Sequence, residues 1–176
     1  MPGLNTVRSV DRAAARVGVE RAVAEAATIG CRTCIAVVDA AAGRAAPLGE
    51  PGLYTDAESS PDGRFLLVER LKAPLSTRVP YFYFARTTEV WDSAGSKVAT
   101  VADLPVSDEV PRQGVPTGPR EIAWQAVAPA TVVWVDALDG GDPTKKVPHR
   151  ERVMTLAAPF AAAPSEVTRL VQRFDV

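Results

Sequence analysis

Three features of the sequence carry side chains that could do chemistry, and the first is a pair of cysteines. Cys31 and Cys34 form Cys-Arg-Thr-Cys, the spacing of a redox dithiol or of half a zinc site. A redox pair normally follows a strand and begins a helix, whereas here helix-like sequence precedes the pair and a strand follows it. A structural zinc needs four ligands, and His149 is the only histidine. We therefore favour two small residues at the entrance of a strand, and we expect no metal or cofactor.

The second feature is His149, the only residue that could act as the base of a Ser-His-Asp triad. It lies in a polar loop, 146–152, that leads into a strand. No Gly-x-Ser-x-Gly nucleophile elbow is present, and Gly95-Ser96 falls in a hairpin turn. We interpret His149 as a surface or loop-packing residue. An independent enzyme that uses His149 is the weakest of our hypotheses, and we predict no catalytic residue.

The third feature is the turn from Asp139 to Asp142, which also contains two glycines. Its two carboxylates could attract calcium, but the alternating ligand spacing of a calcium loop is missing. A plain turn is favoured, since Asp and Gly are turn-forming residues.

A further polar residue of interest is Arg120, which follows Pro-Thr-Gly-Pro. On a loop-lined face it could meet an acidic group, although an ordinary cation at a strand edge is the simpler interpretation.

The elements that would position these residues are β-strands arranged in a repeated pattern. A hairpin around the turn Ser60–Gly63 returns in a second version at 122–135. A second kind of hairpin, with a hydrophobic-hydrophobic-Asp-turn-Gly pattern, occurs at 37–43 and 90–95 and in a weaker form at 152–156. Hairpin pairs that recur in this way are typical of β-propeller blades. The predicted fold is all-β, a partial propeller of about two and a half blades of antiparallel meander sheet.

Local patterns give the expected strands and the segments between them. Strands are predicted at 35–38, 44–48, 65–69, 120–126, 130–136, 150–156 and 166–171. Gly49–Gly52 is expected to end the strand predicted at 44–48. Two proline-containing excursions, 72–83 and 103–119, should be ordered, and the aromatic residues at 81–84 should be shielded from solvent. Core positions on the strands are predicted for the three tryptophans, Trp91, Trp124 and Trp134.

The N-terminal part differs from the rest of the chain. Apolar residues at helical spacing among good helix formers predict a helix over 8–28, ended by Gly30. We therefore divide the chain into a helical N-terminal extension, 1–30, and a partial β-propeller, 31–176.

Composition limits the partners and the location. The 176 residues carry a net charge of −1, with a pI of about 5.9, which argues against a nucleic-acid footprint. No apolar run is long enough to cross a bilayer, so no membrane partner is expected. Charged residues interrupt the N-terminal segment, which therefore does not resemble a signal peptide, and a soluble cytoplasmic protein is the expectation.

An ordered series of loop motifs resembles the N-terminal propeller of the prolyl oligopeptidase family, and most of all the glutamyl endopeptidases. The resemblance covers about residues 35 to 174, and its motifs include Ser60-Pro61-Asp62-Gly63-Arg64, Glu89-Val90-Trp91-Asp92, Val115-Pro116-Thr117-Gly118-Pro119-Arg120, Ala137-Leu138-Asp139-Gly140-Gly141-Asp142-Pro143 and Lys146-Val147-Pro148-His149-Arg150. The resemblance implies a serine peptidase in which the propeller controls access to a C-terminal α/β-hydrolase domain. The catalytic residues of that family have no counterparts here, so the chain alone should be inactive.

The expected partners follow from this resemblance. They are the α/β-hydrolase domain of the parent peptidase and, through that domain, peptide substrates. An incomplete propeller exposes sheet faces and strand edges, so the isolated chain should be marginally stable or should self-associate. A free-standing propeller-like module that binds another protein stays open as an alternative.

Overall fold

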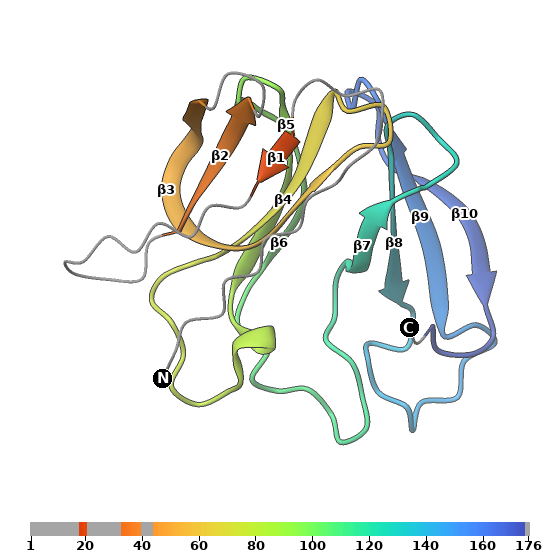
Figure 1. Cartoon of the computed structure of the whole chain (residues 1–176). Helices are drawn as coiled ribbons and strands as arrows, with labels where there is room; N and C mark the ends of the chain where they lie inside the picture. The colour runs from red at the N-terminus through yellow and green to blue at the C-terminus, as the bar shows by residue number, and fades with distance from the viewer. Residues whose placement is uncertain (1–17, 21–32, 40–43, 175–176) are drawn as a thin grey trace.

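The computed structural model describes residues 18–20, 33–39 and 44–174, and in these residues the fold is all-β (Figure 1). Its strands are β1 (Gly18–Glu20), β2 (Thr33–Asp39), β3 (Arg44–Ser59), β4 (Phe65–Leu71), β5 (Arg86–Asp92), β6 (Lys97–Leu104), β7 (Arg120–Trp124), β8 (Thr131–Ala137), β9 (Glu151–Ala157) and β10 (Ser165–Leu170). They form two antiparallel sheets, one in the order β1-β2-β3-β4-β5-β6 and one in the order β10-β9-β8-β7. The all-β prediction is confirmed.

The seven predicted strands correspond to β2, β3, β4, β7, β8, β9 and β10 to within a few residues, except that β3 is much longer than predicted. Strand β1 falls within the predicted helix, and β5 and β6 flank the hairpin turn predicted at 90–95. Gly49–Gly52 was expected to end a strand, but β3 continues through it. The first part of β3 pairs with β2, where Leu48 lies opposite Ile35, and the second part pairs with β4, where Leu53 lies opposite Leu71. Gly49 permits this change of partner because it adopts a φ of +71°, which glycine tolerates best. The glycine therefore bends the strand instead of ending it.

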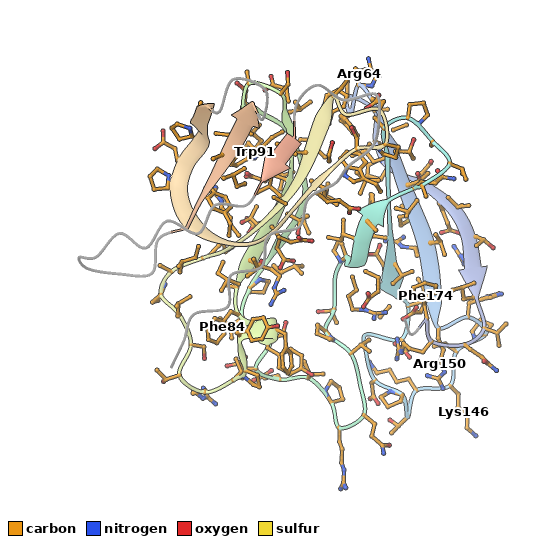
Figure 2. The ribbon with its side chains drawn as sticks, in the orientation of Figure 1. Arg64, Phe84, Trp91, Lys146, Arg150 and Phe174 are labelled. Atoms are coloured by element: carbon orange, nitrogen blue, oxygen red, sulfur yellow. The ribbon has the colours of Figure 1, made fainter. Side chains whose placement is uncertain are left out.

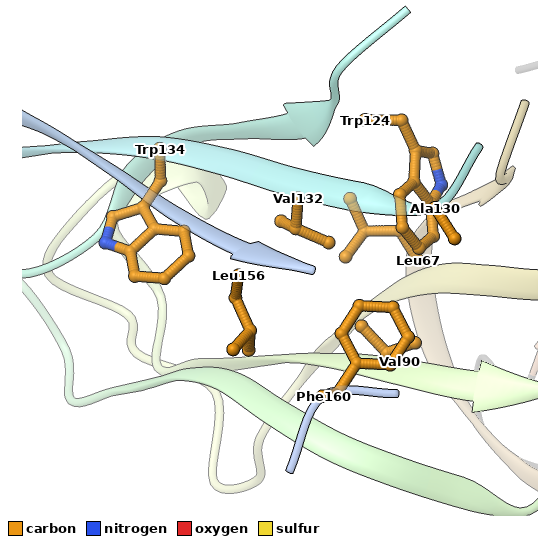
Figure 3. Close-up of a cluster of buried hydrophobic side chains, with 8 residues drawn as sticks. All are labelled: Leu67, Val90, Trp124, Ala130, Val132, Trp134, Leu156 and Phe160. Atoms are coloured by element: carbon orange, nitrogen blue, oxygen red, sulfur yellow. The ribbon is translucent and has the colours of Figure 1, made fainter. Parts of the chain in front are cut away.

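Two four-stranded meanders, β3–β6 and β7–β10, pack face to face (Figures 1 and 3). Leu67 of β4 and Val90 of β5 contribute the apolar surface of the first sheet. They meet Trp124, Ala130, Val132, Trp134, Leu156 and Phe160 of the second sheet and its loops. Phe160 also contacts Phe65 edge to face, with ring centroids 5.1 Å apart. This contact surface makes one core from strands that are far apart in sequence.

The opposite face of the first meander carries a second core. Leu66 and Val68, which alternate with Leu67 along β4, point to this side together with Trp91. They pack against Ile35, Leu48 and Tyr54 of β2 and β3. Strands β4 and β5 are therefore covered on both faces, which explains the continuous buried run at 66–68. All three tryptophans are at most 7% exposed, and their predicted core positions are confirmed.

The predicted N-terminal helix, 8–28, falls mostly outside the described residues. Within it, Gly18–Glu20 forms strand β1, which pairs with β2, so the helix prediction is wrong at these three residues. Val19 is β-branched and Gly18 is a poor helix former, so the local preference for a helix is weak there. Of the two cysteines, Cys34 lies in β2, in agreement with the predicted strand entrance, and Cys31 lies outside the described part.

The aromatic excursion departs from expectation in its exposure. A 3-10 turn, η1 (Tyr81–Tyr83), occupies the connection 72–85. Tyr81 is 64% exposed and Phe82 is 53% exposed, so the prediction that these rings are shielded is wrong for both. Phe82 contacts Tyr81 and Tyr83 edge to face, with ring centroids 5.7 and 4.7 Å apart. Both rings stay exposed because neither belongs to one of the two cores, and the contacts among the rings cover them only in part.

Candidate functional site

The two ends of the paired meanders differ in the length of their connections (Figure 1). Antiparallel strands alternate in direction, so successive connections alternate between the ends. The connections 60–64, 93–96, 125–130 and 158–164 are short and make up what we term the short-loop end. The longer connections 72–85, 105–119 and 138–150 gather at the opposite end, together with residues 171–174. We term this the long-loop end, and it has the greater capacity to carry a site.

Turn chemistry fixes the short-loop end. Asp62 Oδ1 accepts hydrogen bonds from the Ser60 hydroxyl at 2.7 Å and from the Arg64 amide at 3.1 Å. Gly63 adopts a φ of +72°, as the sequence signature predicts. The Asp62 amide donates to the Pro129 carbonyl at 3.0 Å, which joins the turns of the two meanders. The contacts at this end therefore hold the turns of the two meanders together, and Arg64 lies at the surface there (Figure 2).

Between the two sheets at the long-loop end lies a cleft of about 830 Å³. Its polar lining includes Glu69, Arg86, Thr88, Arg120, Arg150 and Arg173. Its apolar lining includes Phe82, Tyr83, Phe84, Val115, Ile122 and Phe174. Phe84, Arg150 and Phe174 are labelled in Figure 2, where they lie toward this end of the molecule. The cleft therefore combines aromatic groups with several guanidinium groups, a composition suited to binding a ligand with both apolar and acceptor groups.

Two fully buried carboxylates hold three of these arginines at the second meander. Glu151, at the start of β9, forms an ion pair with Arg120 of β7 and a second with Arg173 at 3.3 Å. Asp139 forms ion pairs with Arg173 at 2.7 Å and with Arg150 at 2.8 Å. The side chains of both acids are 0% exposed. We refer to these five side chains as the arginine–carboxylate cluster.

Backbone amides complete the hydrogen bonding of both carboxylates. Asp139 Oδ1 accepts from the Gly141 amide at 2.9 Å, and Glu151 Oε2 accepts from the Phe174 amide at 2.8 Å. Burial of a carboxylate is tolerated only when such partners replace its hydration. The cluster therefore fixes both the loop 138–150 and the segment that follows β10.

The hydrogen bonds change the acidity of Asp139. Burial alone would raise its pKa, but the side-chain hydrogen bonds from Arg173 and Arg150, the Gly141 amide and the charge of Arg173 together outweigh burial, and the pKa is lowered. The ionised form is therefore favoured in the folded protein. A group with a lowered folded-state pKa contributes stability above its unfolded pKa, and that contribution is lost as the pH falls toward the folded value.

We expect acid to weaken the long-loop end through Asp139. Below about pH 4, the unfolded-state pKa of an aspartate, the denaturation midpoint of the natural chain should fall more steeply than that of Asp139→Asn. The difference between the two proteins, measured by denaturant titration from pH 7 to pH 3, isolates this carboxylate from other acids. Parallel curves for the two proteins would contradict the expectation.

Four candidate residues from the sequence lie in this region, and the structure shows the surroundings of each. Arg120 does meet an acidic group, Glu151, and its side chain is only 10% exposed, so it is not an ordinary strand-edge cation. His149 is half-buried in the loop 138–150, next to Arg150. In the turn, Asp139 faces guanidiniums, whereas Asp142 accepts from the Thr144 amide and hydroxyl at 2.9 and 2.7 Å. The two aspartates thus have separate partners.

Sequence reasoning missed Glu151 and Arg173 as members of this region. Both lie close to charged neighbours along the chain, a pattern that indicates a solvated surface, and no local signal marks them as buried. The turn motif of Asp139 predicts a plain turn or, less favoured, a calcium ligand, and neither interpretation includes its ion pairs with Arg150 and Arg173. In the described part of the chain, no group of three or more His, Cys, Asp or Glu side chains could hold a metal ion. None of the described helices could span a membrane.

Comparisons with known proteins give two related sequences and one related fold. The chain is 33% identical over 128 residues to a probable chloroplastic glutamyl endopeptidase of Oryza sativa, which covers 71% of this chain and 14% of that protein. It is 37% identical over 123 residues to a probable chloroplastic glutamyl endopeptidase of Arabidopsis thaliana, covering 68% and 13%. The chain is therefore related to glutamyl endopeptidases, and it spans about one seventh of their length. No family model matches it.

The fold likeness is to a crystal structure of an uncharacterized protein from Listeria monocytogenes. The TM-score is 0.50 at 11% identity, and the match covers 86% of this chain and 36% of the other. At this identity the likeness concerns the fold alone.

Proposed function

We propose that this chain is the non-catalytic β-propeller portion of a glutamyl-endopeptidase-like serine peptidase. The observation that carries the proposal is the arrangement of two successive four-stranded meanders, packed face to face, in a chain related to glutamyl endopeptidases. A propeller blade is a four-stranded antiparallel meander that buries both faces against neighbouring blades. Strands β4 and β5 are covered on both sides, as such packing requires.

In the complete peptidase, this portion would control access of peptides to a C-terminal α/β-hydrolase domain. The nucleophile and its base would come from that domain, because neither the sequence nor the cleft supplies a triad. The long-loop end is the better place for a substrate path, since the cleft opens there between the two meanders. In this role the arginine–carboxylate cluster would hold the loops that line the path.

The test combines the coding locus with an activity measurement. The reading frame downstream of Val176 should encode a Gly-x-Ser-x-Gly elbow followed by an aspartate and a histidine. The protein encoded by the complete frame should hydrolyse a fluorogenic glutamyl peptide, whereas the 176-residue chain should not hydrolyse it. Hydrolysis by the chain alone, or a downstream frame without these motifs, would remove the basis of the proposal.

A free-standing interaction module is the second candidate, and the exposed rings of Tyr81 and Phe82 favour it. Contiguous exposed apolar groups often mark contact surfaces, and Leu75 in the same connection is also 45% exposed. Size in solution separates the two candidates. A chain that completes its own propeller should form a defined oligomer, whereas a portion of a larger protein should be marginally stable or self-associate without a fixed stoichiometry.

A further inference from the structure

A row of three polar side chains crosses the first sheet where the sheet borders the cleft. Asp56 of β3 lies directly opposite Glu69 of β4, and Glu69 lies directly opposite Thr88 of β5. Residues paired in this way have Cα atoms about 4.5–5.5 Å apart and point to the same face of the sheet. All three residues line the cleft, and we refer to them as the polar row.

A β-bulge brings Asp56 into the polar row. Tyr54 and Asp56 are two positions apart and would share a face in a regular strand. The pairing of β3 with β4 shifts its register between them, so Tyr54 packs in the second core while Asp56 faces the cleft. Bulges re-aim side chains in this way and are frequent beside functional sites. Asp56 therefore stands next to Glu69 because the strand is locally irregular.

The two carboxylates of the polar row share only one cation. Glu69 Oε1 accepts hydrogen bonds from the Thr55 hydroxyl at 2.7 Å and from Arg86 at 3.0 Å, and Asp56 Oδ1 accepts from the Ala57 amide at 2.9 Å. The second oxygen of each carboxylate has no donor among the described residues. Like charges directly opposite on neighbouring strands repel, and Arg86 neutralises only Glu69. A second cation would remove the repulsion.

Thr88 is an independent indication of a bound group. Its side chain is buried, at 3% exposure, and Oγ1 has no hydrogen-bond partner in the described part of the chain. Buried polar atoms in folded proteins are nearly always satisfied, so an exception calls for a missing partner. Rotation about the Cα–Cβ bond exchanges the positions of the hydroxyl and the methyl group. A group bound at Glu69 is close enough to serve as the partner, because Glu69 is the cross-strand neighbour of Thr88.

The charge of the cleft lining selects the sign of that group. Four arginines line the cleft, and each already forms an ion pair with at least one of three carboxylates. Two further acids of the lining, Asp56 and Glu121, form no ion pair with any described side chain. Four guanidinium groups therefore face five carboxylates. The charge that the lining lacks is positive.

We propose that the cleft binds an alkylammonium group at the polar row, between Asp56 and Glu69. An ammonium has three donors and no acceptor, which suits neighbouring carboxylates whose second oxygens lack donors. Two of its hydrogens would bind the two carboxylates. The third would reach the Thr88 hydroxyl directly or through one water molecule. A neutral amide could not relieve the repulsion between the two acids.

Aromatic side chains beside the polar row suit the stem of such a ligand. Arg86, which binds Glu69, also donates to the Tyr81 carbonyl at 2.9 Å and to the Phe84 carbonyl at 3.3 Å. These contacts hold the segment 81–84 next to the row, and its members Phe82, Tyr83 and Phe84 line the cleft (Figure 2 labels Phe84). Aromatic rings pack against alkyl chains and attract cations.

Two sources share this chemistry, namely a lysine side chain of a polypeptide and a free alkyl amine. The proposal does not depend on the peptidase assignment, because the cleft and the polar row are formed entirely by described residues of this chain. Failure of one would leave the other standing.

The test is an NMR titration of the full 176-residue chain. The probes are Nα-acetyl-lysine methylamide, its Nε-acetylated neutral counterpart and 1,5-diaminopentane. We expect saturable shifts of the amides of the polar row with the two ammonium compounds and none with the acetylated compound. Tighter binding of the lysine compound would identify a polypeptide side chain as the source, and tighter binding of the diamine would identify a free amine.

Two variants locate the bound group. Asp56→Asn should bind both ammonium compounds about tenfold more weakly, the value of one charge-assisted hydrogen bond. Because Asp56 is exposed and its removal relieves repulsion, the unfolding midpoint of this variant should not fall. Thr88→Val removes a hydroxyl that has no protein partner and should weaken binding about threefold. Glu166→Gln, an equal change of charge outside the cleft lining, should bind like the natural chain.

Three results would overturn the proposal. The first is the absence of shifts in the polar row at tens of millimolar of either ammonium compound. The second is equal binding of the lysine compound and its acetylated counterpart, which would show that charge is not recognised. The third is an unchanged affinity in Asp56→Asn, or a loss of the same size in Glu166→Gln, which would leave only a general effect of net charge.

Discussion

An alanine in place of Glu151 should lower the free energy of unfolding by about 3–5 kcal/mol, the cost of leaving a buried ion-pair partner alone. Glu151 is fully buried and binds Arg120, Arg173 and the Phe174 amide. Arg173 would keep Asp139, but Arg120, at 10% exposure, would lose its ion-pair partner. Denaturant unfolding of the full chain measures the loss, and the variant will be largely unfolded if the natural chain is only marginally stable.

Two companion variants show whether burial is the cause. Glu166→Ala breaks an exposed ion pair, with Arg169, and should leave the unfolding midpoint unchanged. The double variant Arg120→Met, Glu151→Leu removes both charges of the buried pair and should recover part of the loss, because apolar groups of similar volume need no partner. A loss of under about 1 kcal/mol in Glu151→Ala, the value of an exposed pair, would contradict the argument.

The sequence was sufficient for most strands because their signals are local. Alternation of apolar residues, and turn residues such as Pro61, Asp62 and Gly63, act within a few positions of the chain. The tryptophans were placed correctly for a related reason, since a large ring on a strand is seldom stable in solvent. The rings of Tyr81 and Phe82 are exposed, contrary to this expectation, because they lie on a connection that contributes to neither core.

The arginine–carboxylate cluster could not be predicted, because its contacts join distant parts of the chain. Arg120 and Glu151 are 31 positions apart, and Arg173 and Asp139 are 34 positions apart. Whether a charged residue at the end of a strand is solvated or buried depends on which loops return to cover it. The position of Arg120 after Pro-Thr-Gly-Pro is compatible with an acidic contact, but it neither favours that contact over an ordinary strand-edge cation nor identifies Glu151 as the partner.

Continuity of β3 through Gly49 shows a second limit of local patterns. Glycine and proline at 49–52 are usual signs of a strand end, yet the strand changes partner there and continues. The reason lies in the packing of Trp91, whose ring carbons would lie 2.3 and 2.5 Å from a Cβ at position 49. The glycine is needed for this close approach as well as for its positive φ, and neither requirement can be seen in the neighbouring residues.

Alanine at position 141 should separate the two long loops that border the cleft. A Cβ there would lie 2.0 Å from the Val115 carbonyl oxygen, a backbone atom that cannot turn aside, and Gly141 has a φ of +78°. The Val115 amide donates to the Gly141 carbonyl at 3.1 Å, so the clash would also break the hydrogen bond between loops 105–119 and 138–150. The Gly141 amide, which binds Asp139, would move with it.

The neighbouring glycine provides a matched control for this change. Gly140 has a similar φ of +70°, but a Cβ there would meet only the flexible Lys145 side chain, at 3.2 Å. Gly140→Ala should therefore cost about 1 kcal/mol of conformational strain, and Gly141→Ala should cost about 1–3 kcal/mol more. Hydrogen exchange would show faster exchange of the Val115 amide in Gly141→Ala alone. Equal stabilities of the two variants would mean that backbone strain, and not the contact between the loops, determines the effect.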